Sequence, residues 1–305
     1  MRHSLNALTD ELRRLRAAGV KNIAVSDESI AQLRRVIAAR APAVDPAVSE
    51  VASAPVNSEP RPARAALAVK TVALPGTAQP ELPPPPVVQL PAGDKAQRWA
   101  ALLDLVTADP VCRANVRPGK KVVLGVGSVD AAIMFVGEAP GAEEEIQGEP
   151  FVGPAGHLLT KMIQGMGLKR SEVYIGNIMN WRPQMPTVEG REQIGNRPPS
   201  EAEMRYCLPY LRAQIEVVNP ALLVALGSTA AQGLLGVGSF KALGEIRGQW
   251  REFGGKPLMV TYHPSYILRN QSNRSKRMIW EDLLKVMERA ALPVSEKQRG
   301  FFLEK

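Results

Sequence analysis

The chain has 305 residues and a formal net charge of +8 at pH 7, with a sequence pI of about 9.6. This charge suits a polyanionic partner, although many cytoplasmic proteins are equally basic, so charge alone identifies no ligand. No apolar run approaches membrane-spanning length, and residues 1–20 are too polar and too rich in arginine for a secretory signal. The two cysteines have no evident pairing pattern, which is typical of a protein of the reducing cytoplasm.

The first third of the chain lacks the side chains that build a large core. All 15 aromatic residues lie from Trp99 onward, and 12 of the 26 prolines fall between Pro42 and Pro91. We therefore expect residues 41–95 to form a disordered Pro/Ala-rich linker. Before it, apolar stripes predict a helical segment at residues 1–40. The folded domain is expected at residues 96–291, followed by a tail at 292–305.

Strand-like and helix-like segments alternate from Trp99 onward. Apolar stretches predict strands at residues 131–136, 173–178, 222–226 and 258–262, and the segments between and after them predict helices at 155–166, 200–218, 228–235 and about 275–289. This order is typical of an α/β fold with a mainly parallel sheet covered by helices on both faces. In such folds, ligands bind at the carboxyl ends of the strands.

The most informative segment follows the first predicted strand. Residues 137–159 read GEAPGAEEEIQGEPFVGPAGHLL, and this run closely resembles the first motif of the family 4 uracil-DNA glycosylases. Four further stretches match that family in the same order: YIGNIMNWRP at 174–183, NRPPSEAEMRYCLPYL at 196–211, ALLVALGSTAAQGLLG at 221–236 and TYHPSYILR at 261–269. The resemblance extends from about residue 122 to 286. It implies a three-layer α/β/α sandwich with a central four-stranded, mainly parallel sheet.

The resemblance also implies a binding site for a base that is flipped out of DNA. Phe151 matches the residue that stacks on the base, although without its flanking glycines it would be interpreted as an ordinary core phenylalanine. Asn177 matches the residue that reads uracil through one acceptor for N3–H and one donor for O4, whereas an Asn at a strand end is commonly a turn former. Ala139 and Gly137 are expected at the same base-binding site.

The catalytic groups follow from the same matches. His263 matches the family's histidine, whose donor near O2 of the leaving uracil is worth on the order of 3 kcal/mol by analogy with oxyanion-hole donors. Glu144 is expected to position water and stabilise the sugar in the transition state, and Glu138 to line the pocket and help exclude a 5-methyl group. Glu143 is interpreted as a solvated charge, and Glu145 replaces an aspartate that is usual in the family.

A basic segment, ILRNQSNRSKR, occupies residues 267–277 directly after the histidine. Basic loops are usually just solvated, but this one adjoins a candidate catalytic residue and is well placed to contact the DNA backbone. Leu268 and Arg269 are the candidates for filling the gap left by the flipped base. Arg274, Lys276 and Arg277 are expected to bind DNA.

The chain departs from the family at its iron–sulfur site. Family 4 members typically hold a 4Fe–4S cluster on four cysteines, but only Cys112 and Cys207 match, and Asp109 and Trp181 occupy the other two positions. Two thiolates are too few for a four-cysteine cluster. We therefore expect no cofactor and no metal, with Trp181 and its neighbours filling the vacated volume.

Two further segments carry weaker signals. The insertion at residues 185–194 lies in a region where one branch of the superfamily has a histidine that traps the abasic sugar, and no histidine occurs here, so turnover by hydrolysis is expected. The tail contains Gln298, Phe301 and Phe302, which loosely resemble peptides that bind sliding clamps. Docking of the aromatic pair onto its own domain is the simpler interpretation.

The sequence thus predicts a monomeric, cytoplasmic and nucleoid-associated enzyme that hydrolyses the N-glycosidic bond of uracil in DNA, leaves an abasic site and so initiates base excision repair. Two alternatives stay open. One is a glycosylase for another deaminated base such as hypoxanthine, because the width of the pocket is not visible. The other is a non-catalytic module that binds damaged DNA, which the combination of Glu144, Asn177 and His263 disfavours, because a binder needs no acid to position water.

Overall fold

The computed structural model describes residues 82–187 and 192–303. The predicted helical segment at residues 1–40 and most of the predicted linker lie outside these ranges. The last part of the linker, residues 82–94, has no helix or strand, and Leu82, Val88 and Leu90 pack against the core of the domain. Within the described ranges, no helix is long and apolar enough to cross a membrane.

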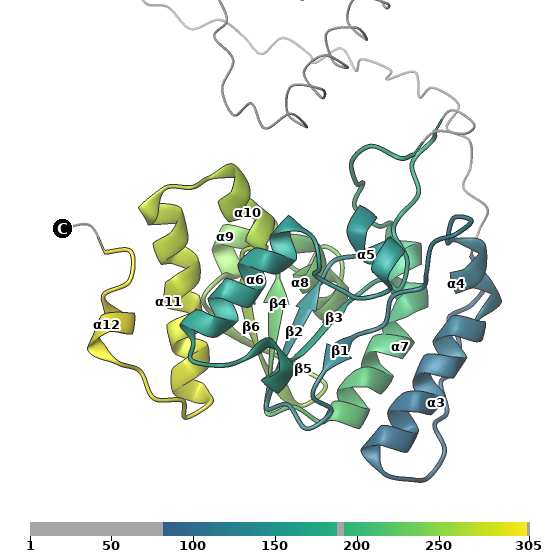
Figure 1. Cartoon of the computed structure of the whole chain (residues 1–305), viewed down its shortest axis with the longest axis horizontal. Helices are drawn as coiled ribbons and strands as arrows, with labels where there is room; N and C mark the ends of the chain where they lie inside the picture. Colours follow the sequence, from purple (N-terminus) through teal and green to yellow (C-terminus); the bar gives the residue numbers. More distant parts are fainter. Residues whose placement is uncertain (1–81, 188–191, 304–305) are drawn as a thin grey trace, which may run out of the picture. The chain divides into compact units, whose positions relative to one another are not determined.

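A six-stranded sheet forms the centre of the domain, with the strand order β1-β3-β2-β4-β6-β5 (Figure 1). The four inner strands run parallel: β3 (Tyr174–Asn177), β2 (Ile133–Gly137), β4 (Leu222–Leu226) and β6 (Lys256–Thr261). Two antiparallel edge strands, β1 (Val126–Gly127) and β5 (Trp250–Phe253), complete the sheet. The predicted α/β fold is confirmed, and its four parallel strands are present, but the prediction of four strands missed both edges.

Helices surround this sheet, and four of them match the predicted ranges closely. These four are α6 (Pro154–Gly165), α7 (Glu201–Val218), α8 (Ser228–Leu235) and α11 (Asn273–Arg289). The others are α3 (Lys95–Ala108), α4 (Pro110–Ala114), α5 (Ala142–Gln147), α9 (Leu243–Ile246), α10 (Pro264–Arg269), α12 (Glu296–Arg299) and a 3-10 turn, η1 (Arg170–Glu172). Helix α7 begins where Ser200 and Glu203 cap each other's backbone amides, a capping box that the motif NRPPSEAE encodes.

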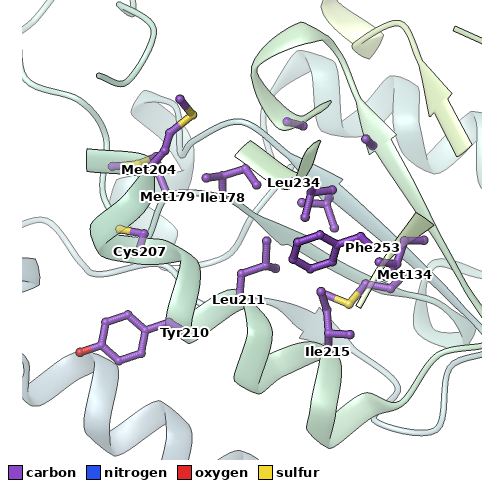
Figure 2. Close-up of a cluster of buried hydrophobic side chains, with 14 of the residues drawn as sticks. Met134, Ile178, Met179, Met204, Cys207, Tyr210, Leu211, Ile215, Leu234 and Phe253 are labelled. Carbon is purple, nitrogen blue, oxygen red and sulfur yellow. The ribbon is translucent and has the colours of Figure 1, made fainter. Parts of the chain in front are cut away.

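The inner strands are buried on both faces, as expected for a parallel sheet between two helical layers. Along β2, Ile133 and Phe135 belong to the cluster that includes α6 and α11, whereas Met134 and Val136 belong to the cluster that includes α3, α7 and α8. Figure 2 shows part of the second cluster, in which Leu211 of α7 packs. The two clusters fix the sheet between the layers, so the carboxyl ends of the inner strands meet at one rim.

A buried carboxylate joins α4 to α7. Asp109 accepts hydrogen bonds from the hydroxyls of Tyr206 at 2.9 Å and Tyr210 at 2.8 Å and from the backbone amide of Cys112 at 2.6 Å. Burial acts to raise the pKa of Asp109, but these hydrogen bonds outweigh it and hold the pKa below the ordinary value of 3.8. A carboxylate with a depressed pKa stabilises the fold at pH values above its unfolded pKa, and this contribution is lost as the pH falls through the folded pKa.

We expect Asp109→Asn to lower the free energy of unfolding by about 2–3 kcal/mol at pH 7, because a charged acceptor of three buried hydrogen bonds is replaced. Urea denaturation measures the loss, with Asp104→Asn on the exposed face of α3 as the control. The difference between wild type and variant should shrink as the pH is lowered below about 4. A constant difference down to pH 2, by contrast, would argue against an ionised Asp109.

Candidate active site

A cavity of about 670 Å³ lies at the carboxyl ends of the four parallel strands. Its wall includes residues that follow or end β2, β3, β4 and β6, which is where open α/β sheets bind ligands. Most of the predicted site residues line it: Glu138, Ala139, Glu144, Phe151, Asn177, His263 and Arg269. The fold therefore gathers residues from five separate sequence motifs at one place, in a volume typical of small-molecule pockets.

Phe151 and Asn177 approach each other directly above Gly137. Gly137 ends β2 and pairs in register with Asn177 of β3. A Cβ atom at Gly137 would lie 2.4 Å from Asn177 Oδ1 and 2.5 Å from the Phe151 ring, closer than real contacts allow. Only glycine at this position leaves room for the aromatic ring and the amide together. Gly137 itself is not among the residues that line the cavity.

The backbone of Phe151 is held in a strained conformation. Its φ of +56° lies in the left-handed region, which is costly for a residue with a side chain. Arg170 Nη2 donates to the Pro150 carbonyl at 2.6 Å, and Gly156 approaches so closely that a Cβ there would lie 1.8 Å from Phe151 O. These contacts hold the Phe151 ring at the cavity, 5.6 Å from the His263 ring between centroids.

Asn177 offers an unused acceptor to the cavity. The residue is 6% exposed, yet its Oδ1 has no hydrogen-bond partner within the described residues. An unpaired buried acceptor costs about 1–3 kcal/mol, so it favours a ligand that donates a hydrogen bond at this point. The amide nitrogen of the same group supplies a donor beside it, so Asn177 offers one acceptor and one donor in a single planar group.

His263 presents a donor to the cavity. It caps the amino end of α10, where Nδ1 accepts from the backbone amide of Ser265 at 3.2 Å and lies 2.8 Å from the Ser265 hydroxyl. Because Nδ1 accepts from an amide, the ring proton of the neutral form belongs on Nε2. Burial, and then the charge of Arg269, lowers the pKa of His263 from 6.5 to about 4. His263 is therefore a neutral Nε2–H donor at physiological pH.

Glu144 joins two loops through its carboxylate. Oε1 accepts from the amides of Val152 at 3.1 Å and Gly153 at 3.0 Å, and Oε2 accepts from the amide of Gly141 at 3.1 Å. A carboxylate has about four acceptor positions, so three protein bonds leave about one for a water molecule. Glu144 thus orders the loop that carries Phe151 and still faces the cavity.

Glu138 lies on the α8 side of the cavity. It follows β2 directly, and its backbone carbonyl accepts from the Met179 amide at 3.1 Å. Burial raises the pKa of the Glu138 carboxyl above its usual range, and a hydrogen bond with Thr229 offsets part of this effect. The two predicted acids therefore have different environments: amides surround Glu144, whereas Glu138 is desolvated.

The two neighbouring acids differ in burial. Glu143 also borders the cavity, but its side chain is exposed to solvent. Glu145 is buried and forms an ion pair with Arg182 at 2.8 Å, and Arg182 also donates to Asn196 Oδ1 at 2.8 Å. This ion pair connects α5 to the segment that follows β3, so Glu145 holds these two parts of the chain together.

The basic segment at 267–277 divides between two surroundings. Leu268 is 41% exposed at the end of α10, Arg269 lines the cavity, and Arg274 is exposed on α11. Arg277 instead donates to the carbonyls of Arg299 and Phe301 in the tail, and Lys276 lines a separate apolar cavity with Phe301.

The tail itself docks on the domain. Gln298 Nε2 donates to the Gly165 carbonyl at 2.9 Å, Trp280 Nε1 donates to the Gln298 carbonyl at 2.6 Å, and the Phe301 ring lies 5.2 Å from Trp280. Phe302 is 39% exposed. In the described structure the tail is thus bound to α6 and α11.

Sequence reasoning missed several residues of the cavity wall. Thr229 follows β4, and the rings of Tyr262 and Tyr266 are stacked with their centroids 4.3 Å apart. Arg197 also lines the cavity. Position in the sequence could have identified two of these residues, because Thr229 and Tyr262 lie at or just beyond the ends of the predicted strands that correspond to β4 and β6. These side chains widen the polar and aromatic surface around the predicted residues.

The side chains at the positions of the iron–sulfur ligands do not fit a four-cysteine cluster. Cys112 and Cys207 are both fully buried, and burial raises the pKa of each thiol, which opposes the thiolate form that binds iron. Asp109 is committed to two tyrosines, and Trp181 is buried beside Tyr206. Among the residues with described positions, no group of three His, Cys, Asp or Glu side chains is arranged to hold a metal ion.

The amino-acid sequence is similar to those of known proteins across the region that forms this cavity. A model of the uracil DNA glycosylase superfamily matches residues 124–284. The chain is 42% identical over 165 residues to the type-4 uracil-DNA glycosylase of Thermotoga maritima, covering 54% of this chain and 80% of that protein. It is 40% identical over 176 residues to the type-4 enzyme of Saccharolobus solfataricus, covering 55% and 76% respectively. The matched region contains the whole cavity, and the chain belongs to the uracil-DNA glycosylase superfamily as a family 4-like member.

Proposed function

We propose that the protein removes uracil from DNA by hydrolysing its N-glycosidic bond, as a monofunctional glycosylase that initiates base excision repair. The observation that carries the proposal is the unpaired Asn177 Oδ1 beside the Phe151 ring and opposite the neutral His263. Together these groups offer a stacking face, an acceptor, a donor for O4 and a second donor. The type-4 relatives are named for the same activity.

Recognition begins with the flipped base against Phe151. Asn177 accepts from N3–H and donates to O4, whereas cytosine presents an acceptor at N3 and a donor at its amino group, so both contacts would be mismatched. His263 Nε2–H donates to O2. As the C1′–N1 bond breaks, its electron pair moves to the uracil ring and negative charge develops at O2, so this hydrogen bond strengthens towards the transition state.

Water attacks the sugar from the side of Glu144. The remaining acceptor position of this carboxylate orients the water, and its negative charge stabilises the cationic sugar that forms as uracil leaves. The water oxygen bonds to C1′, one water proton is released, and the uracil anion takes up one proton, so the products are an abasic site and free uracil. Glu138 borders the other side of the cavity, where it contributes to excluding a 5-methyl group.

Release of uracil by the purified protein tests the proposal directly. Oligonucleotides that contain uracil, hypoxanthine or a thymine mismatch, single- and double-stranded, are incubated with protein and then treated with alkali, which cleaves abasic sites. We expect strand breaks at uracil. Breaks only at hypoxanthine would indicate a different base preference, and no breaks on any substrate would favour a non-catalytic module that binds damaged DNA.

We expect Asn177→Asp to reduce kcat/KM for uracil by on the order of 100-fold or more, because a carboxylate in place of the amide removes the donor to O4 and adds charge beside it. Discrimination against cytosine should narrow at the same time. Single-turnover cleavage of matched uracil and cytosine substrates measures both effects. Unchanged selectivity would remove Asn177 from base reading.

We expect His263→Ala to lower kcat by about 10²–10³-fold while the pH profile between pH 6 and 8 keeps its shape. The reason is the lowered pKa of about 4, which leaves His263 neutral over this whole range. Rates measured from pH 5 to 9 for both proteins check this, with thermal unfolding as the control for folding. If the rate of the wild-type protein changed with pH near pH 6.5 and this change were absent from the variant, the reaction would require protonated His263.

We also propose that the protein works without a 4Fe–4S cluster. Support comes from the two protonated, buried thiols and from the engagement of Asp109 and Trp181 in core contacts. Protein purified under anaerobic conditions should lack a broad absorption band at about 400 nm, and a chelator should leave its unfolding midpoint unchanged. A band of this kind that a chelator removes, with a fall in the unfolding midpoint, would contradict the proposal.

Binding to a sliding clamp through Gln298, Phe301 and Phe302 stays a prediction. It would require Gln298 and Phe301 to leave their contacts with Gly165 and Trp280. The monomeric state and the nucleoid-associated cytoplasmic location likewise remain predictions.

A further inference from the structure

A basic groove lies at the opposite end of α5 from the catalytic cavity. It has a volume of about 610 Å³ and is formed by the end of α3, by α4 and the loop after it, and by the residues that end and follow α5. Arg113, Arg117, Lys120 and Lys121 line it, and Glu149 is the one acid among the described residues of its wall. We call this feature the α4–α5 groove. Its charge is not used by any step of the proposed reaction.

Two of the four cations have a structural role. Arg117 Nη2 donates to Gln193 Oε1 at 2.6 Å and to the Met185 carbonyl at 3.2 Å, and Lys120 forms an ion pair with Glu192 at 3.1 Å. These contacts attach the insertion to the loop after α4. Glu192 is largely exposed, so its pairing with Lys120 neutralises only part of the local charge.

The other two cations face solvent. Arg113 is exposed at the end of α4 and has no ion pair or hydrogen bond from its guanidinium to any residue in the described ranges. Lys121 is fixed at its base, because its amide donates to the Glu145 carbonyl at 2.7 Å and its stem packs on Gly148, where a Cβ would lie 2.9 Å from Lys121 Cδ. The groove therefore presents two exposed positive charges to solvent.

Capping of α5 explains only part of this arrangement. Lys121 Nζ donates to the Gln147 carbonyl at 3.3 Å, which satisfies one group at the carboxyl end of the helix. The ammonium retains two further donors. Arg113 belongs to α4 and, among the described residues, donates no side-chain hydrogen bond to the carboxyl end of α5. Capping of α5 therefore does not account for both cations.

Helix α5 connects the groove to the catalytic cavity, because its two ends line the two sites. The first residues of α5 line the cavity, and Gln147, Gly148 and Glu149 line the groove. Six residues of helix at 1.5 Å each span about 9 Å. Phosphates follow one another every 3.4 Å of axis along one DNA strand, so this distance corresponds to roughly two to three nucleotides. Arg269 borders the cavity from α10, a helix that lies to the left of α5 in Figure 1.

We propose that the α4–α5 groove binds the sugar–phosphate backbone of DNA two to three nucleotides from the flipped base, with Arg113 and Lys121 as its phosphate contacts. The inference rests on the proposed function, since it presumes that DNA occupies the catalytic cavity. It assigns to these residues a positioning role that is independent of base sequence. Substrate would then be held on both flanks of the cavity, by α10 on one side and by the groove on the other.

Salt-dependent binding tests the proposal. The dissociation constant for a duplex several helical turns long with a stable abasic-site analogue is measured by fluorescence anisotropy from about 50 to 200 mM salt. For Arg113→Gln/Lys121→Gln we expect binding to weaken on the order of tenfold at the lowest salt. A plot of log affinity against log salt concentration has a negative slope, and its magnitude should decrease by about 2, because each lost phosphate contact removes about 0.9.

Two control variants make the result specific. Arg113→Lys/Lys121→Arg keeps both charges and should keep the salt slope. Arg251→Gln/Lys297→Gln removes two exposed charges from β5 and α12 and should not alter the slope. The proposal is overturned if the groove variant matches this second control, or if it loses affinity with an unchanged slope and a lowered unfolding midpoint, as mere capping of α5 would produce. Failure of the proposed function would appear separately, as wild-type protein that releases no uracil.

Discussion

The parallel pairing of β2 with β3 is the constraint on which the site depends. Its register places Gly137 opposite Asn177, and the missing side chain of Gly137 provides the space in which the Phe151 ring and the Asn177 amide meet. A shift of one residue would turn the amide to the other face of the sheet. The apolar clusters on both faces hold this register, so packing far from the cavity determines the shape of the cavity wall at Phe151 and Asn177.

Three glutamates close together in sequence have separate environments, and the environment decides what each can do. Three backbone amides donate to the carboxylate of Glu144, burial raises the pKa of Glu138, and Glu145 forms an ion pair with Arg182. Desolvation likewise lowers the pKa of the half-buried His263 and leaves it a neutral donor. Electrostatic roles in this site therefore arise from desolvation and from backbone groups more than from residue type.

The sequence predicted the parts of the fold that have strong local signals. Strands β2 and β4 are buried along their whole length, so they appear as continuous apolar runs, and α7 carries its own capping box at Ser200. Strand β1 has only two residues, and β5 exposes Arg251 and Glu252, so neither produces a hydrophobic pattern that sequence reasoning could detect. The sequence motifs identified many of the residues that line the cavity, because these motifs lie at the strand ends where the cavity forms.

Contacts between distant segments were beyond the reach of the sequence. The three amides that bind Glu144 and the tail carbonyls that bind Arg277 are backbone groups with no signature of their own. The link between Asp109 and two tyrosines of α7 is of the same kind, and it has a broader consequence. Hydrogen bonds of this sort form as the polypeptide folds, so under the proposal that the protein holds no 4Fe–4S cluster, the contact between α4 and α7 forms without any supply of iron.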